Sequence, residues 1–179
     1  MKIAAVIYPP GQAKVLDDLF CEVAATLRAR GVGLAGTIQR NEATDGNACA
    51  SMMLQDLVSS RVFDISVPAA FKTEACSLDP AALEDVAGCV AATLGPGIGL
   101  VIVNRFGKQE VLGCGLRSVI EQAVSGGIPV LTALCATHLD HWTSFAGDDW
   151  SRLDLCKDSI LAWAADHAIS RVLHLSPLG

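Results

Sequence analysis

Short apolar runs alternate with stretches of helical spacing along most of the chain. Residues 3–8 form an apolar run that ends in a Pro-Pro-Gly turn, and residues 32–38 form a second run. Between them, residues 15–30 carry apolar side chains three and four positions apart, which is the spacing of an amphipathic helix. This order of strand, turn, helix and strand predicts a βαβ unit with a right-handed crossover.

The remainder of the chain repeats this alternation. Helices are predicted over 77–94, 115–125, 138–145 and 159–167, strands over 99–103 and 128–134, and the tail 171–175 is a candidate edge strand. Near-continuous apolar strands are typical of parallel sheets that are buried on both faces. The pattern therefore predicts a three-layer α/β fold, with a mostly parallel sheet covered by helices on both faces. A chain of 179 residues is expected to form a single domain over 1–179.

One segment interrupts the alternation of strands and helices. After a polar stretch over 39–47, two short alternating segments at 51–57 and 62–67 are separated by Val-Ser-Ser-Arg, which contains no strong turn dipeptide. They predict a β-hairpin insertion over about 48–68. We expect this hairpin at an antiparallel edge of the sheet.

Composition excludes several classes of protein. The formal net charge is −6 and there is no run of Lys or Arg, which argues against nucleic-acid binding. The longest apolar runs are strand-length, far below the roughly 20 residues of a spanning helix, so we expect no membrane insertion. The N-terminus lacks the apolar core of a signal peptide. Seven cysteines without a CxxC pair, several in apolar contexts, indicate a cytoplasmic protein with reduced thiols.

The segment from Asn104 to Glu110 is the sharpest candidate site. The apolar run 99–103 is followed there by polar residues on both sides of one glycine, among them an amide, two cations and a carboxylate. In open α/β sheets, ligands bind beyond the carboxyl ends of the strands. The candidate ligand-binding residues are Asn104, Arg105, Lys108 and Gln109, and Glu110 is the candidate catalytic carboxylate. The alternative is a surface loop whose charged residues satisfy one another.

The turn after the first strand is a second candidate. A phosphate-binding P-loop reads Gly-x-x-x-x-Gly-Lys-Ser/Thr. Here Lys14 stands where the P-loop lysine would, but alanine precedes it and valine follows it. The helix N-terminus still offers backbone N–H groups to an anion, with Gly11 and Gln12 in the turn. The alternative is an ordinary turn with a solvated lysine.

The polar stretch after the second predicted strand is a third candidate. Arg40 and Asn41 follow the carboxyl end of that strand, so they are expected to face the same crevice, unless they form a plain loop. Cys49 and Cys76 flank the hairpin, and with Met52 or Met53 they are candidates for a soft metal site. Their spacing matches no known metal pattern, and neutral structural thiols are the alternative.

Several segments together carry a family resemblance. They are residues 2–6 with the following Pro-Gly turn, 34–41, 76–79, 103–110, Gly113, 115–117 and 127–133. In these segments the chain resembles an uncharacterised bacterial domain family allied to the P-loop NTPases, with members sometimes labelled molybdenum-transport-associated or NTPase-like. The layout is also similar to the thermophile-type nucleoside-triphosphatase family.

The resemblance implies roles by position. Lys14 falls on the P-loop lysine, Asn104 on the metal-binding aspartate and Arg105 on the catalytic glutamate, while Lys108 and Glu110 match. It implies a P-loop-NTPase-like fold with degenerate Walker motifs. Asn is a poor magnesium anchor and Arg cannot act as a base at neutral pH, so magnesium is a doubtful cofactor.

These observations lead to one hypothesis and two alternatives. We expect a protein that binds a small anionic ligand, a nucleotide or an oxyanion such as molybdate, at a crevice lined by the three candidate segments. The family labels imply an accessory or regulatory role in molybdenum supply. One alternative is a divergent nucleoside triphosphatase or nucleotide-dependent transferase in which Glu110 positions water or metal. The other is a cysteine-based metal binder. A homo-oligomer is compatible with the sequence.

Overall fold

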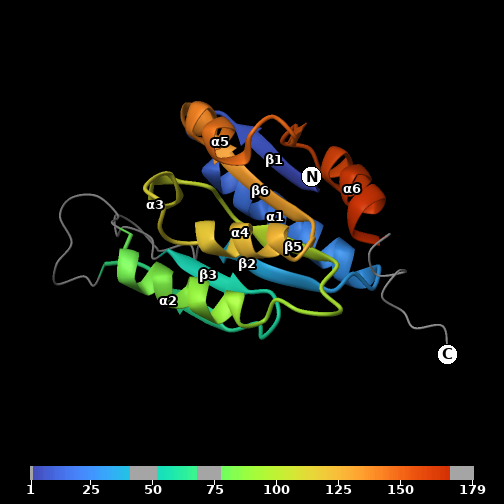
Figure 1. The fold of residues 1–179 in the computed structure, drawn as a ribbon, viewed down its shortest axis with the longest axis horizontal. Helices are drawn as coiled ribbons and strands as arrows, with labels where there is room; N and C mark the ends of the chain where they lie inside the picture. The colour runs from blue at the N-terminus through green and yellow to red at the C-terminus, as the bar shows by residue number, and fades with distance from the viewer. Residues whose placement is uncertain (1, 41–51, 68–77, 170–179) are drawn as a thin grey trace.

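A seven-stranded, mostly parallel sheet forms the centre of the described part of the protein (Figure 1). The computed structural model describes residues 2–40, 52–67 and 78–169. The strands are β1 (Ile3–Tyr8), β2 (Leu34–Arg40), β3 (Met53–Asp56), β4 (Val62–Asp64), β5 (Leu100–Val103), β6 (Val130–Cys135) and β7 (Ser151–Leu153). Their order across the sheet is β4-β3-β2-β5-β6-β1-β7. Strands β2, β5, β6, β1 and β7 pair in parallel, and β3 and β4 add an antiparallel edge.

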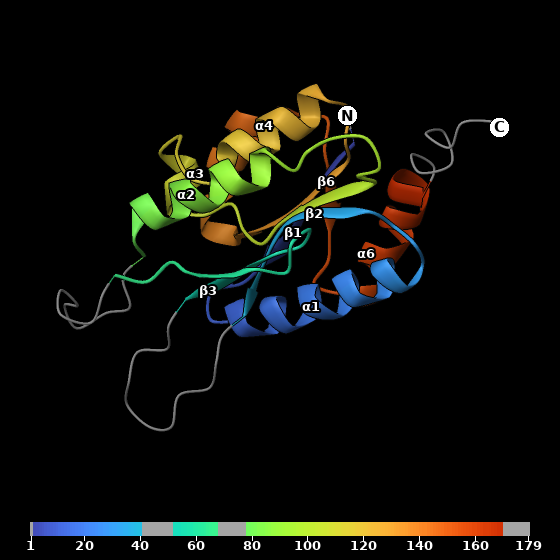
Figure 2. The same cartoon turned by 90° about the horizontal axis from the view of Figure 1, so that it is seen from below.

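Helices cover both faces of this sheet (Figure 2). They are α1 (Ala13–Ala29), α2 (Pro80–Ala91), α3 (Lys108–Val111), α4 (Arg117–Ser125), α5 (Leu139–Ala146) and α6 (Lys157–Ala164), with a 3₁₀ turn before α5 and a π-helical turn after α6. Helices α1 and α6 pack together on one face, whereas α2 and α4 pack on the other. The predicted three-layer α/β architecture is confirmed. Within the described residues, no helix combines the length and apolar character needed to cross a membrane.

The two apolar cores explain the near-continuous apolar strands. In β5, Leu100 and Ile102 join the core under α1 and α6, while Val101 and Val103 join the core under α2 and α4. All four side chains of this strand are completely buried. A strand covered on both faces has no polar alternation, as parallel strands require.

The predicted hairpin is confirmed as the pair β3 and β4 at one edge of the sheet. Asp79 caps the start of α2, where its side chain accepts hydrogen bonds from the N–H groups of Ala81 and Ala82. Strand β7 was not predicted, because it has three residues and only Leu153 is buried. The predicted tail strand over 171–175 lies outside the described residues.

Strands β2 and β5 approach each other unusually closely at Gly36. Its φ is +99°, and a Cβ atom there would lie 2.0 Å from the backbone oxygen of Ile102. Only glycine is compatible with this contact, because any side chain would push the strands apart. The parallel pairing of β2 with β5 places their carboxyl ends side by side, with Gln39 near the end of β2 and Asn104 directly after β5.

Candidate ligand-binding site

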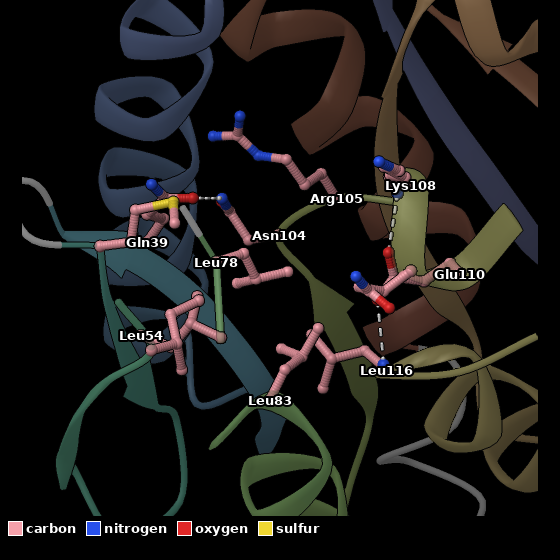
Figure 3. Close-up of a pocket in the computed structure, with 13 residues that line it drawn as sticks. Gln39, Leu54, Leu78, Leu83, Asn104, Arg105, Lys108, Glu110 and Leu116 are labelled. Carbon is pink, nitrogen blue, oxygen red and sulfur yellow. Dashed lines mark hydrogen bonds between the residues drawn. The ribbon is translucent and has the colours of Figure 1, made fainter. Parts of the chain in front are cut away.

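A cavity of about 160 Å³ lies at the carboxyl ends of β2 and β5, between the hairpin, α2 and the segment 104–116 (Figure 3). Its polar lining comes from Gln39, Asn104, Arg105, Lys108, Gln109 and Glu110. Its apolar lining comes from Met52, Leu54, Ile65, Leu78, Leu83 and Leu116. The 104–110 segment therefore faces a cavity at the strand edge where ligands bind in open α/β sheets.

A buried polar cluster closes one side of this cavity. Asn104 is 1% exposed, and its Nδ2 donates to Asp17 Oδ1 at 2.9 Å and to Gln39 Oε1 at 3.4 Å. Arg105 Nη2 donates to the same Asp17 oxygen at 2.5 Å, with the guanidinium carbon 6.0 Å from the ring centroid of Tyr8. Burial raises the pKa of the Tyr8 hydroxyl, while the charge of Arg105 opposes that shift. Residues from β1, α1, β2 and the end of β5 therefore meet in one cluster.

Two atoms of this cluster are buried without a hydrogen-bond partner among the described residues. They are Asn104 Oδ1 and Arg105 Nε. The amide orientation of Asn104 follows from its chemistry, because only its nitrogen can donate to the Asp17 carboxylate. An unsatisfied buried polar atom costs about 1–3 kcal/mol, so such atoms are rare in folded proteins. One free acceptor and one free donor thus belong to residues that line the cavity.

Glu110 is held by the backbone on both carboxylate oxygens. Oε2 accepts from the N–H of Gly107 at 2.9 Å, and Oε1 accepts from the N–H of Leu116 at 3.0 Å. Burial raises the pKa of Glu110, the hydrogen bonds from Gly107 and Leu116 lower it, and the charge of Glu84 raises it. These contacts connect the start of α3 to the loop before α4. They give Glu110 a structural role, and its catalytic role stays a prediction.

A glycine keeps the loop before α4 against Glu110. Gly115 has φ +64°, and a Cβ atom there would lie 2.6 Å from Glu110 Oε1 and 2.8 Å from Leu83 Cδ2. The N–H of Gly115 also donates to Glu84 Oε1. The loop that carries Leu116 is therefore fixed by two carboxylates, which makes the wall of the cavity well defined.

The third candidate, the polar stretch after the second predicted strand, lies partly beside this cavity. Gln39 lines it, but Arg40 is exposed and its Nε donates to Gln55 Oε1 at 2.6 Å. Arg40 instead lines a neighbouring depression together with Asp17, Asp18 and Cys21. Asn41 lies outside the described residues. Of this segment, only Gln39 therefore reaches the polar cluster.

The predicted turn after β1 stays on the surface. Gly11 and Gln12 are exposed, and Lys14 forms an ion pair with Asp18 at 3.0 Å while its side chain remains 77% exposed. Neither cavity at this edge has these three residues in its lining. The cations expected to converge thus separate, because Arg105 and Lys108 line the cavity whereas Lys14 and Arg40 do not.

Asp17 is the site residue that the sequence reasoning missed. It is 3% exposed on α1, where Phe20 and Ala24 follow at the third and seventh positions. An acidic residue within the apolar stripe of a helix is a detectable signal, because a buried carboxylate needs a cationic or N–H partner. In the structure, Arg105 and Asn104 are these partners of the Asp17 carboxylate.

The candidate soft metal site cannot be assembled from the described residues. Cys49 and Cys76 lie outside them, while Met52 lines the cavity and Met53 lines the neighbouring depression. Among the residues that the structure covers, no group of three or more His, Cys, Asp or Glu side chains is placed to hold a metal ion.

Comparison with known proteins places the chain in a family. Residues 3–163 match the family described as "Protein of unknown function (DUF2478)". The chain belongs to this family. It is also 36% identical over 167 residues to "Molybdenum import ATP-binding protein ModC 2" of Bradyrhizobium diazoefficiens. The match covers 92% of this chain but only 18% of that relative. No solved structure matches the chain.

The similarity to a relative named as an ATP-binding protein supports a P-loop-NTPase-like relationship, and the three-layer α/β fold is consistent with it. Because one fold hosts many functions, the role of this chain has to be argued from its cavity.

Proposed function

We propose that the protein binds a small anionic ligand in the cavity at the ends of β2 and β5. The observation that carries this proposal is that two cations, Arg105 and Lys108, line one cavity at the carboxyl ends of β2 and β5. The unsatisfied buried atoms Asn104 Oδ1 and Arg105 Nε belong to the polar cluster beside it. Lys108, which is exposed at the rim, and Gln109 would add contacts to the same ligand.

The arrangement of Arg105 supports an anionic ligand. Its Nη2 is bonded to Asp17, which fixes the guanidinium, while Nε is left over. A planar guanidinium that is held in position loses little entropy when it binds an acceptor group. Hydrogen bonds from a charged donor to an anion are also about twice as strong as neutral ones.

The printed name of the relative suggests two ligand classes. A nucleotide would suit the P-loop-NTPase-like relationship. An oxyanion such as molybdate would suit the relative named as a molybdenum import protein. Either ligand would give the protein an accessory or regulatory role in molybdenum supply. The matched segment is less than a fifth of that relative, so the activity of the whole relative is not transferred.

A thermal-shift titration tests this proposal. The protein is titrated with ATP, GTP, molybdate and the simple organic anion benzoate, with and without magnesium, since a ligand that binds only the folded state raises the Tm. We expect at least one probe to raise the Tm, and Arg105→Gln to abolish the rise. Lys14→Gln is the matched control, because it also removes a cation at the same edge and should leave the rise intact.

Two results would contradict the proposal. One is that no probe changes the Tm. The other is an equal rise in the wild type and in Arg105→Gln, which would place the bound anion elsewhere on the molecule.

A further inference from the structure

The cavity has two chemically different sides (Figure 3). The leucine side chains gather on one side, and the guanidinium of Arg105 lies on the other. Leu54, Leu83 and Leu116 are each at most 5% exposed, so they form part of the core as well as the cavity wall. A ligand that consisted only of an oxyanion would contact the polar side and leave this apolar wall without a partner.

The size of the cavity limits the apolar part of a ligand. Its volume is about 160 Å³. An engineered apolar cavity of roughly 150 Å³ in another protein binds benzene. By this comparison, the cavity accommodates one six-membered ring or an aliphatic group of similar size. A larger ligand would have to extend past the polar rim.

The charges around the cavity limit the anionic part. Two cations, Arg105 and Lys108, stand on the polar side. Three carboxylates oppose this positive charge. Asp17 already forms an ion pair with Arg105, and Glu110 lines the same cavity. Glu84 is nearby, where it accepts a hydrogen bond from the N–H of Gly115. Desolvating a dianion without a surplus of positive charge is costly. This balance favours a ligand with one negative charge over molybdate or a polyphosphate.

We infer that the ligand is an organic monoanion with an apolar body the size of one ring. The apolar body packs against Leu54, Leu83 and Leu116, and the anionic group accepts from Arg105 with Lys108 nearby. This inference rests on the proposed function, because it names the class of ligand for the same cavity.

Isothermal titration with simple anions tests the ligand class. The probes are benzoate, acetate, phenyl phosphate, inorganic phosphate and molybdate. We expect benzoate to bind at least tenfold more tightly than acetate, and phenyl phosphate at least tenfold more tightly than inorganic phosphate. The comparison of benzoate with phenyl phosphate distinguishes a carboxylate from a phosphate monoester. Molybdate should bind no more tightly than acetate.

Two variants with opposite effects on volume locate the ring. Leu54→Phe fills the apolar side and should remove the preference for benzoate over acetate. Leu83→Ala enlarges the same side and should shift the preference from benzoate towards naphthoate. Val90→Ala is the matched control, because Val90 is a buried residue of the same helix α2 that does not line the cavity. It should leave the order of affinities unchanged.

The outcomes separate this inference from the proposed function. If molybdate or inorganic phosphate binds more tightly than benzoate, and Arg105→Gln abolishes that binding, the ligand class is wrong and the proposed site stands. If benzoate affinity is unchanged in both Leu54→Phe and Leu83→Ala, the ring lies elsewhere and the inference is also wrong. If none of the anions binds, both the inference and the proposed function fail.

Discussion

The turn after β1 and the segment after β5 look equivalent in the sequence but differ in the folded protein. Both follow a buried parallel strand, and both present cations and amides. In the turn, Lys14 is 77% exposed and paired with Asp18. After β5, Asn104 is 1% exposed, and one of its polar atoms has no partner among the described residues.

The difference shows which polar groups carry information about a ligand. Water satisfies the exposed groups of the turn at little cost, so their polarity is compatible with any function. A buried amide or guanidinium has no such alternative, and an unsatisfied atom there requires a partner. Burial and incomplete hydrogen bonding in residues that also line a cavity therefore distinguish the segment after β5 from the turn.

The largest expected effect is on stability, at the acid that joins the two regions. Asp17→Ala removes the acceptor of both Asn104 Nδ2 and Arg105 Nη2. Because buried polar groups lose their partner, we expect the free energy of unfolding to fall by about 2–4 kcal/mol, discounted for the partial exposure of Arg105. Urea unfolding measures this change.

The neighbouring acid provides the control for this experiment. Asp18 is exposed and pairs with Lys14, so Asp18→Ala should cost less than about 0.5 kcal/mol. Equal losses in the two variants would remove the proposed difference between the regions.

The next effect concerns ligand affinity. Arg105→Gln should weaken binding of the anion that gives a thermal shift by about 10- to 100-fold, because a charge-assisted hydrogen bond contributes about 1.5–3 kcal/mol. Lys14→Gln should change the Kd by less than about twofold, as an exposed charge outside the cavity acts only through a screened field. A larger loss in Lys14→Gln, measured by isothermal titration, would move the site to the turn.

Glu110→Gln should produce a smaller effect that depends on pH. The amide keeps one acceptor but places an NH₂ group against a backbone N–H, which should cost about 1–2 kcal/mol. The pKa of Glu110 is raised in the folded state, so folding favours the protonated side chain. Its contribution to the free energy of unfolding is complete below about pH 4.5, the ordinary pKa of the side chain, and is lost as the pH rises through the raised pKa of the folded state.

The destabilisation by Glu110→Gln should therefore shrink as the pH increases from about 4.5, measured by unfolding at a series of pH values. A destabilisation by Glu110→Gln that grows with pH would show that the pKa of Glu110 is lowered, not raised, in the folded protein. Magnesium-dependent phosphate release that is lost in Glu110→Gln would instead support the nucleoside-triphosphatase alternative.

The smallest effect is expected in the turn itself. Lys14→Gln removes an exposed ion pair between positions four apart on α1, which contributes about 0.3–0.5 kcal/mol. High salt should reduce even this difference, because the pair is open to solvent. A loss above about 1 kcal/mol in thermal unfolding would show that the turn is more constrained than its exposure indicates.

Much of the fold was predictable from the chain, and part of the site was not. The apolar runs identified four of the seven strands in the described residues, and the two alternating segments after 50 indicated the two strands of the hairpin. The 104–110 segment was recognised because its polar residues end a buried strand abruptly. Strand β7 was missed because one buried leucine in three residues leaves no periodic pattern.

The sequence alone established which segments are buried, since burial on a helix or strand repeats with a local period that neighbouring residues express together. It could not establish which strand ends meet. That depended on strand order, which puts β2 beside β5 and joins Gln39 to Asn104, and on the path of α1, which carries Asp17 to Arg105. Such contacts join positions 65 and 88 residues apart, where no local pattern reaches.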